Sequence, residues 1–175
     1  LLESPLLNEK LGGRVLIKAE CLQLSGAFKF RGATNAVKML GEEAENGVCT
    51  HSSGNHAQAL ALAAKQRGIP AYIVMPKTAP RVKVAGVESH DAEITFCEPT
   101  LAARETAAAD VIERTNATLV HPYDDPDVIA GQGTMGLEIL EQVPDVSVVV
   151  VPVGGGGMIS GIACAIKEIK PDVRI

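Results

Sequence analysis

The feature that most constrains the fold is a regular alternation of short apolar segments with helical patterns through the middle of the chain. Such an order argues for a parallel sheet whose right-handed crossovers place helices on both faces. The sequence therefore predicts an α/β fold. The predicted strands are residues 48–51, 71–75, 92–97 and 118–121, and the predicted helices are residues 55–67, 81–88, 101–115 and 128–142.

The regions on either side of this alternation predict further elements of the same kind. Residues 146–153 are apolar almost throughout, as expected of a strand that is buried on both faces. A helix from about 159 to 169 follows them. Near the other end, residues 14–20 predict a strand and residues 27–40 a helix, for which Ser25 would be the N-cap.

Composition and charge exclude several classes of function. The chain is 46% hydrophobic but only 3% aromatic, so its core must consist of Ala, Val, Ile and Leu. A net charge of −5 gives no electrostatic reason to expect binding to nucleic acid. The longest apolar run is too short to cross a bilayer, so no membrane contact is expected. The four cysteines and four histidines show no metal-binding spacing, and reduced thiols predict a cytoplasmic protein.

The first candidate for chemistry is Lys29, which lies between Phe28 and Phe30 in the first turn of a predicted helix. The partial positive charge of a helix start and the apolar neighbours both disfavour a charged amine. A neutral amine can attack a carbonyl and form a Schiff base. The alternative is a surface lysine whose stem covers apolar surface.

The second candidate is the stretch from His51 to Ala57, which includes Ser52, Asn55 and His56 and joins a predicted strand to a predicted helix. Backbone N–H groups at a helix start bind anions, and Ser and Asn side chains add donors. A substrate carboxylate would fit there. An ordinary N-cap turn, for which this composition is common, is the alternative.

The third candidate is the glycine run that follows the most apolar segment and precedes a helix. It consists of Gly154, Gly155, Gly156 and Gly157, with Met158 next. Glycines let the backbone approach a ligand closely and turn several N–H groups toward one point, which is typical of phosphate binding. The run is neither a P-loop nor a dinucleotide fingerprint. A flexible connector is the alternative, although four glycines cost much conformational entropy.

Together, the three candidates suggest one cofactor. A reactive lysine, a phosphate loop and an anion-binding turn call for a phosphorylated aldehyde and an anionic substrate. Pyridoxal phosphate with an amino acid meets all three demands.

The same motifs carry a resemblance to a known group of enzymes. The segments 25–32, 52–56 and 154–157 resemble, in order and spacing, the cofactor-lysine motif, substrate loop and phosphate loop of fold-type II pyridoxal-phosphate enzymes, the tryptophan synthase β-like class. Segments 131–134 and 78–80 also resemble this class. Within it, the chain is most similar to the serine racemase and serine/threonine dehydratase family.

The resemblance implies a role for each matched residue. Lys29 would carry the cofactor and move the α-proton, and Asn55 would bind its 3′-oxygen. Gly154 to Gly157 and the Met158 amide would hold the phosphate. The substrate carboxylate would be bound by Ser52, Ser53, Asn55 and His56. Ser53 would also be the second acid/base that a racemase needs on the opposite face of the substrate, because serine racemases have Ser here and many threonine dehydratases have Ala.

The resemblance further implies two interleaved domains and a set of partners. Residues 46–124 would form the small domain, and residues 1–45 and 125–175 parts of the large, cofactor-holding domain. The substrates would be serine and threonine, and the protein would be a homodimer. The pyridine-nitrogen partner and a divalent cation, Mg²⁺ or Ca²⁺, would involve sequence outside this chain. Residues 171–175 begin like another strand, so we expect a fragment with little activity by itself.

The alternatives for activity stay open at this stage. The main hypothesis is serine racemisation with elimination of water as a second reaction. A dedicated L-serine/L-threonine dehydratase is one alternative, and a non-catalytic homologue that binds the cofactor is another. Cysteine-synthase-like β-replacement is a third, against which the two serines at 52 and 53 argue.

Overall fold

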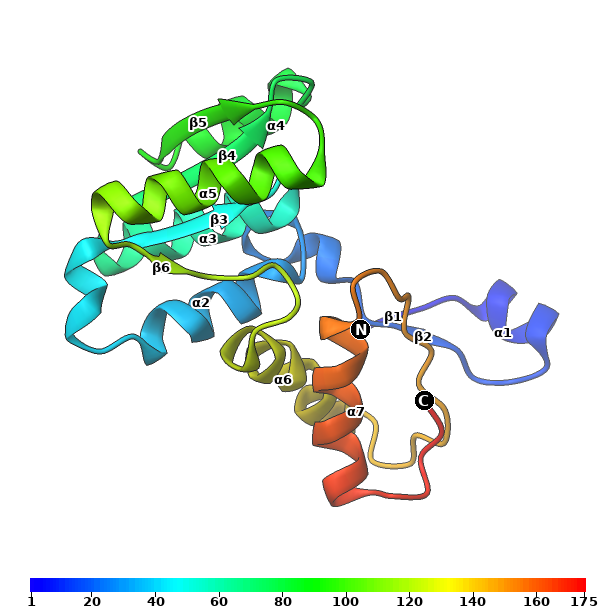
Figure 1. The fold of residues 1–175 in the computed structure, drawn as a ribbon. Helices are drawn as coiled ribbons and strands as arrows, with labels where there is room; N and C mark the ends of the chain where they lie inside the picture. Colours follow the sequence, from blue (N-terminus) through cyan, green and yellow to red (C-terminus); the bar gives the residue numbers. More distant parts are fainter.

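The structure is a computed structural model that describes residues 1–175. Its centre is a four-stranded, fully parallel sheet with the strand order β5–β4–β3–β6 (Figure 1). The predicted alternation of strands and helices is confirmed. The elements are β3 (Val48–His51), α3 (Asn55–Arg67), β4 (Ala71–Pro76), α4 (Arg81–Glu88), β5 (Glu93–Cys97), α5 (Leu101–Thr115) and β6 (Thr118–Leu119).

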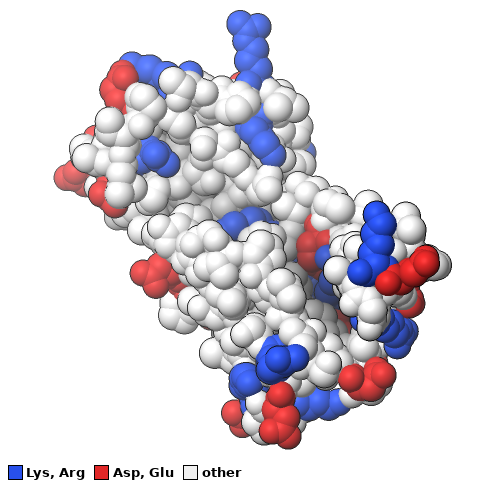
Figure 2. Space-filling view, turned by 90° about the vertical axis from the view of Figure 1, so that its right-hand side faces the viewer, with Lys and Arg blue, Asp and Glu red and all other residues white.

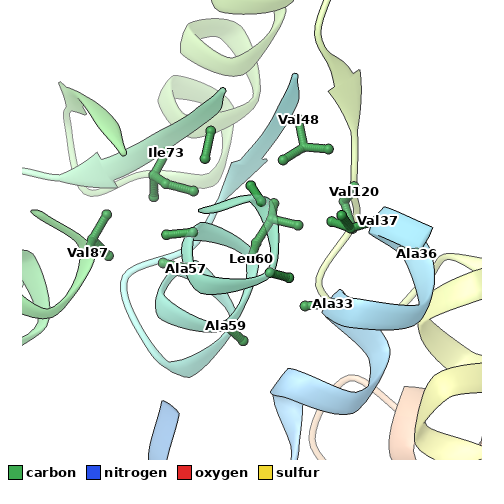
Figure 3. Close-up of a cluster of buried hydrophobic side chains, with 14 of the residues drawn as sticks. Ala33, Ala36, Val37, Val48, Ala57, Ala59, Leu60, Ile73, Val87 and Val120 are labelled. Carbon is green, nitrogen blue, oxygen red and sulfur yellow. The ribbon is translucent and has the colours of Figure 1, made fainter. Parts of the chain in front are cut away.

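Helices cover both faces of this sheet, with α5 on one side and α3 and α4 on the other (Figure 1). Alternate residues of a strand point to opposite faces. Accordingly, Val48 and Ile73 belong to the core beneath α3, whereas Cys49 and Val74 pack beneath α5. Leu60 of α3 is fully buried in the first core (Figure 3). Burial of such a side chain contributes about 1.5–3 kcal/mol to stability.

Three further helices form the second part of the molecule. They are α2 (Lys29–Met39), α6 (Pro126–Gln142) and α7 (Gly157–Ile169). Helix α2 packs against both α3 and α6, and α6 packs against α7. Ala33, Ala36 and Val37 of α2 lie in the same buried cluster as Leu60 (Figure 3). Helix α2 therefore joins the sheet to the pair of helices below it.

The N-terminal residues form elements that the sequence analysis did not predict. Strand β1 (Leu2–Glu3) pairs antiparallel with β2 (Leu16–Ile17), and α1 (Pro5–Leu11) lies between them. The predicted strand 14–20 is therefore present only as β2. Three short 3₁₀ helices complete the chain: η1 (Glu20–Leu22), η2 (Leu24–Gly26) and η3 (Glu42–Asn46).

The prediction that Ser25 is the N-cap of the following helix is wrong. Ser25 lies in η2 with a φ of 61°, and its hydroxyl oxygen is buried without a hydrogen-bond partner. Helix α2 begins at Lys29, and no side chain caps it. The chain turns through η2 before the helix starts, so Phe28 and not Ser25 occupies the N-cap position.

The prediction of a buried strand at residues 146–153 is also wrong for this structure. The segment forms only one isolated bridge, between Val148 and Arg174. Val149 is buried, but Val150 is 90% exposed and Val153 is 63% exposed. An apolar run becomes a buried strand only where neighbouring strands lie on both sides. The one bridge that this segment forms is with Arg174, so the predicted strand 171–175 is likewise reduced to that bridge.

The helices were also compared with the requirements for crossing a membrane. None of them combines the length and the apolar character needed to cross a bilayer.

Candidate active site

A cavity of about 320 Å³ brings together Lys29 and the glycine run, which are far apart in the sequence. Lys29 enters it from the first residue of α2, and the glycines enter it from the loop before α7. Apolar side chains form part of its lining. The lining residues are Phe28, Lys29, Tyr123, Pro152, Val153, Gly154, Gly155, Gly156, Gly157, Met158 and Ile159.

The environment of Lys29 favours the neutral amine. Burial lowers the pKa of its amine below the ordinary value, as the sequence analysis predicted. The Nζ atom donates a hydrogen bond to the carbonyl oxygen of Pro122 and lies 5.3 Å from the centre of the Phe28 ring. An amine of this kind is suited to attack an aldehyde.

The glycine loop has the donors and the space that a phosphate needs. Helix α7 begins at Gly157 without a side-chain cap, so the N–H groups of its first turn are free to bind an anion. Gly156 has a φ of 92°, which side chains rarely allow. A Cβ atom on Gly155 would lie 2.3 Å from Cγ of Tyr123. The residues present therefore fit a phosphorylated aldehyde that is held by Lys29 at one end and by the loop at the other.

The predicted substrate turn lies at the carboxyl end of β3, but its residues do not line the cavity. The Ser52 hydroxyl accepts a hydrogen bond from the N–H of Gly54 at 3.3 Å, and Ser53 is half-buried. The side-chain oxygen of Asn55 accepts a hydrogen bond from Nζ of Lys83 at 2.6 Å. Because the oxygen is engaged, the NH₂ group of Asn55 remains as a donor.

His56 is buried, so its side chain does not line a solvent-filled site. Its Nε2 atom lies 3.2 Å from the carbonyl oxygen of Val120. A carbonyl only accepts hydrogen bonds, so this nitrogen carries the proton, and Nδ1 is left without a partner. Burial, and next the charge of Lys29, lower the pKa of His56 to about 3. His56 is therefore neutral near pH 7.

Tyr123 is a residue of the cavity that the sequence analysis missed. The ring of His121 stands edge-on to that of Tyr123, with centres 4.6 Å apart, and to that of His51 at 5.8 Å. The prediction that His51 and His121 end neighbouring strands is confirmed for His51, since β3 ends there and pairs with β6. Strand β6 ends at Leu119, two residues before His121. The available signal for Tyr123 was a large aromatic residue two positions after the predicted end of a strand, in a chain with few aromatics.

A group of charges holds the start of α2 in place. All five N–H donors of Arg31 are used: Glu20 and Glu138 each accept two hydrogen bonds from it, at 2.6–2.9 Å, and Thr134 accepts one at 3.1 Å. Nζ of Lys18 lies 2.6 Å from the Glu138 carboxylate. The hydrogen bonds from Arg31 lower the pKa of Glu138 to about 2. This group ties η1, α2 and α6 together two residues after Lys29.

The remaining charges show no second site. No group of three or more His, Cys, Asp or Glu side chains is arranged to hold a metal ion. On the face shown in Figure 2, basic and acidic side chains are interspersed, without an extended patch of one sign.

Comparisons with known proteins agree with the geometry. The family described as "Pyridoxal-phosphate dependent enzyme" matches residues 1–175. Serine racemase of Arabidopsis thaliana is 53% identical over 176 residues, which cover 100% of this chain and 53% of that protein. The structure of maize serine racemase matches with a TM-score of 0.98 and 47% identity, over 99% of this chain and 53% of that one.

A threonine deaminase has the same architecture. The processed form of isoform 2 from Solanum lycopersicum matches with a TM-score of 0.93 and 40% identity, over 99% of this chain and 48% of that one. The chain spans about half the length of the curated relatives it matches. The match over the whole chain, the α/β fold and the cavity that joins Lys29 to the glycine loop lead to one conclusion: the chain belongs to the family of pyridoxal-phosphate-dependent enzymes and has their fold-type II architecture.

Proposed function

We propose that the complete protein interconverts L-serine and D-serine and also eliminates water from serine or threonine, giving pyruvate or 2-oxobutanoate and ammonia. The observation that carries this proposal is the shared cavity of Lys29 and the glycine loop. The choice of serine as the substrate is supported by relatives that are named serine racemases.

Different residues in and near the cavity would bind different parts of the cofactor. When bound, pyridoxal phosphate supplies a ring that withdraws electrons and so stabilises negative charge at the α-carbon of an amino acid. Lys29 would hold the aldehyde end, and the N–H groups of Gly154 to Gly157 and of Met158 would hold the phosphate. The free NH₂ group of Asn55 would donate to the 3′-oxygen.

The turn after β3 would bind and orient the substrate. The hydroxyls of Ser52 and Ser53 and the NH₂ of Asn55 would donate to its carboxylate. His56 would contribute its backbone N–H at the start of α3, because its ring is buried.

Two groups would then move protons at the α-carbon from opposite faces. The Lys29 amine would remove the proton of L-serine, and the Ser53 hydroxyl would return one from the other side. Elimination would need only departure of the β-hydroxyl, so it would compete with racemisation.

The organisation of the complete protein follows the same proposal. Residues 46–124 would form the small domain, and residues 1–45 and 125–175 would belong to the large domain, with the substrate between them. We also propose that the complete protein is a homodimer and is located in the cytoplasm. Residues outside this chain would bind a Mg²⁺ or Ca²⁺ ion. The four free cysteines fit a reducing compartment.

One alternative has a specific observation in its favour. The match to a threonine deaminase supports a dedicated dehydratase, in which Ser53 would only bind the carboxylate. A homologue that binds the cofactor without turnover is the remaining alternative.

The variant Ser53→Ala distinguishes these functions. Loss of a positioned acid typically costs about 10²–10⁴-fold in rate. Racemisation of L-serine should fall by that order, while elimination of water from L-serine continues. With D-serine both reactions should fail, because Ser53 would be the group that removes the proton. The measurement is chiral analysis of serine together with a pyruvate assay, on the complete protein.

The other outcomes of this experiment are equally informative. Wild type that forms pyruvate but no D-serine would establish the dehydratase. Equal loss of both activities on L-serine in the variant would restrict Ser53 to carboxylate binding. A wild type that binds the cofactor and yields neither product would establish the non-catalytic homologue.

A further inference from the structure

The segment between β6 and α6 is fixed at both of its ends. At the first end, the N–H of Val120 donates to the carbonyl of Cys49 at 2.8 Å, and the carbonyl of Val120 accepts from His56. At the other end, the Asp125 carboxylate accepts hydrogen bonds from the N–H groups of Asp127 and Val128, at 2.9 and 3.0 Å. Residues 121–124 therefore form a short turn between two anchored points.

His121 organises this turn through one ring nitrogen. Its Nδ1 atom accepts hydrogen bonds from the N–H groups of Tyr123, at 3.4 Å, and Asp124, at 2.9 Å. A side-chain acceptor that binds the second and third N–H groups after it is the arrangement by which Asn and Asp stabilise turns and helix starts. Both hydrogen bonds require an Nδ1 atom that acts as the acceptor.

The turn contacts both halves of the cofactor cavity. The carbonyl oxygen of Pro122 accepts the hydrogen bond from Nζ of Lys29. The ring of Tyr123 lies directly against Gly155, and its carbonyl oxygen would be 2.6 Å from a Cβ atom on Gly157. The conformation of residues 121–124 thus sets where the amine and the glycine loop lie relative to each other.

We propose that His121 is a positioning residue for cofactor capture: by accepting the two N–H groups it holds the turn in the form that aims Pro122 at Lys29 and Tyr123 at the glycine loop. The inference rests on the proposed role of Lys29 as the cofactor lysine. His121 itself does not line the cavity, so it acts only through its neighbours.

Two substitutions of His121 test the hydrogen-bond acceptor and the aromatic ring separately. His121→Phe keeps an aromatic ring beside His51 and Tyr123 but removes the acceptor. His121→Asn removes the ring but keeps a side-chain oxygen that can accept the same two N–H groups. The matched control is His51→Leu, which removes a ring that stands edge-on to His121 and leaves the turn's hydrogen bonds intact.

The experiment titrates each complete protein with pyridoxal phosphate and follows the visible absorbance. Borohydride reduction and peptide mapping then give the fraction attached at Lys29, and thermal unfolding reports stability. We expect His121→Phe to bind about tenfold more weakly, the order expected from loss of a side-chain cap. His121→Asn and His51→Leu should stay within about threefold of wild type, with no label moved to other lysines.

Several results would overturn the inference. They are wild-type affinity in His121→Phe, weakening in His121→Asn equal to that in His121→Phe, or equal weakening in His51→Leu. If His121→Phe fails to fold, His121→Asn still decides the question. About tenfold weaker binding in that variant would overturn the inference, and affinity within about threefold of wild type would support it. A wild type that captures no cofactor at Lys29 would instead overturn the lysine assignment and the inference with it. Because only that failure involves the wild type, the two are distinguishable.

Discussion

Two basic side chains near the cavity, Lys29 and His56, have pKa values that burial holds below their usual range. For Lys29 this favours the nucleophilic amine. For His56 it leaves a neutral imidazole that fixes the carbonyl of Val120, at the point where the chain leaves the sheet. In both cases the main cause is burial, which disfavours the charged form of a basic group.

His56 should make the protein less stable in acid. Its pKa is lowered from 6.5 to about 3 in the folded state, so below pH 6.5 the unfolded chain binds a proton that the folded protein does not. Stability contributed by the neutral ring is thus complete above pH 6.5 and is lost as the pH falls toward 3. The loss should be about 1.4 kcal/mol per pH unit, or roughly 2 kcal/mol at pH 5.

Urea unfolding of wild type and His56→Gln between pH 7.5 and pH 4.5 checks this expectation. The variant keeps an N–H donor for Val120 but has no group that titrates. It should therefore lose less stability than wild type on acidification, whatever its stability at pH 7.5. Parallel pH profiles for the two proteins would contradict the lowered pKa of His56.

At the scale of elements, the cavity lies between two helix starts that no side chain caps. Helix α2 begins at Lys29, and α7 begins at Gly157. Ser, Thr, Asp and Asn are the residues preferred at such a position, because their side chains accept the free N–H groups. At α7 these groups stay available for an anion, while at α2 the group around Arg31 holds the helix from its side.

The close approach of Tyr123 to the glycine loop predicts different effects of two neighbouring substitutions. In Gly155→Ala the new methyl group would lie 2.3 Å from the Tyr123 ring, so the loop or the ring must move. Gly154→Ala places its methyl group in open space. Overpacking of this kind costs about 1–3 kcal/mol, so Gly155→Ala should weaken cofactor binding by roughly tenfold or more.

The measurement is the apparent dissociation constant for pyridoxal phosphate of both variants, with thermal unfolding as a check on the fold. Gly154→Ala should be affected much less than Gly155→Ala. Equal affinities would mean that the loop adapts to the methyl group, and the close contact would then have no part in binding.

At the scale of the whole molecule, the sequence predicted the elements that depend on local patterns. Helices α3, α4 and α5 have the predicted limits, and the parallel order follows from the alternation of strands and helices. Lys29 and the glycine loop were also predicted, because their residue types are unusual for their positions. Each of these predictions needed only nearby residues.

Two of the failures, the strand at 146–153 and the omission of Tyr123, depended on residues distant in the sequence. Residues 146–153 have the composition of a buried strand, but burial depends on which strands lie beside them, and Val150 is exposed. Tyr123 reaches the cavity only because the turn after β6 lies against Gly155. Strand β1 and helix α1 carry too few residues for a periodic pattern.

The most direct test of the account is the identity of the lysine that captures the cofactor. The complete protein would be loaded with pyridoxal phosphate, reduced with borohydride, digested, and mapped by mass spectrometry. We predict the label on the peptide that contains Lys29 and no label in Lys29→Ala. A label on Lys38 or Lys65 in the wild type, or persistence of a specific label in Lys29→Ala, would contradict the assignment of the cavity as the cofactor site.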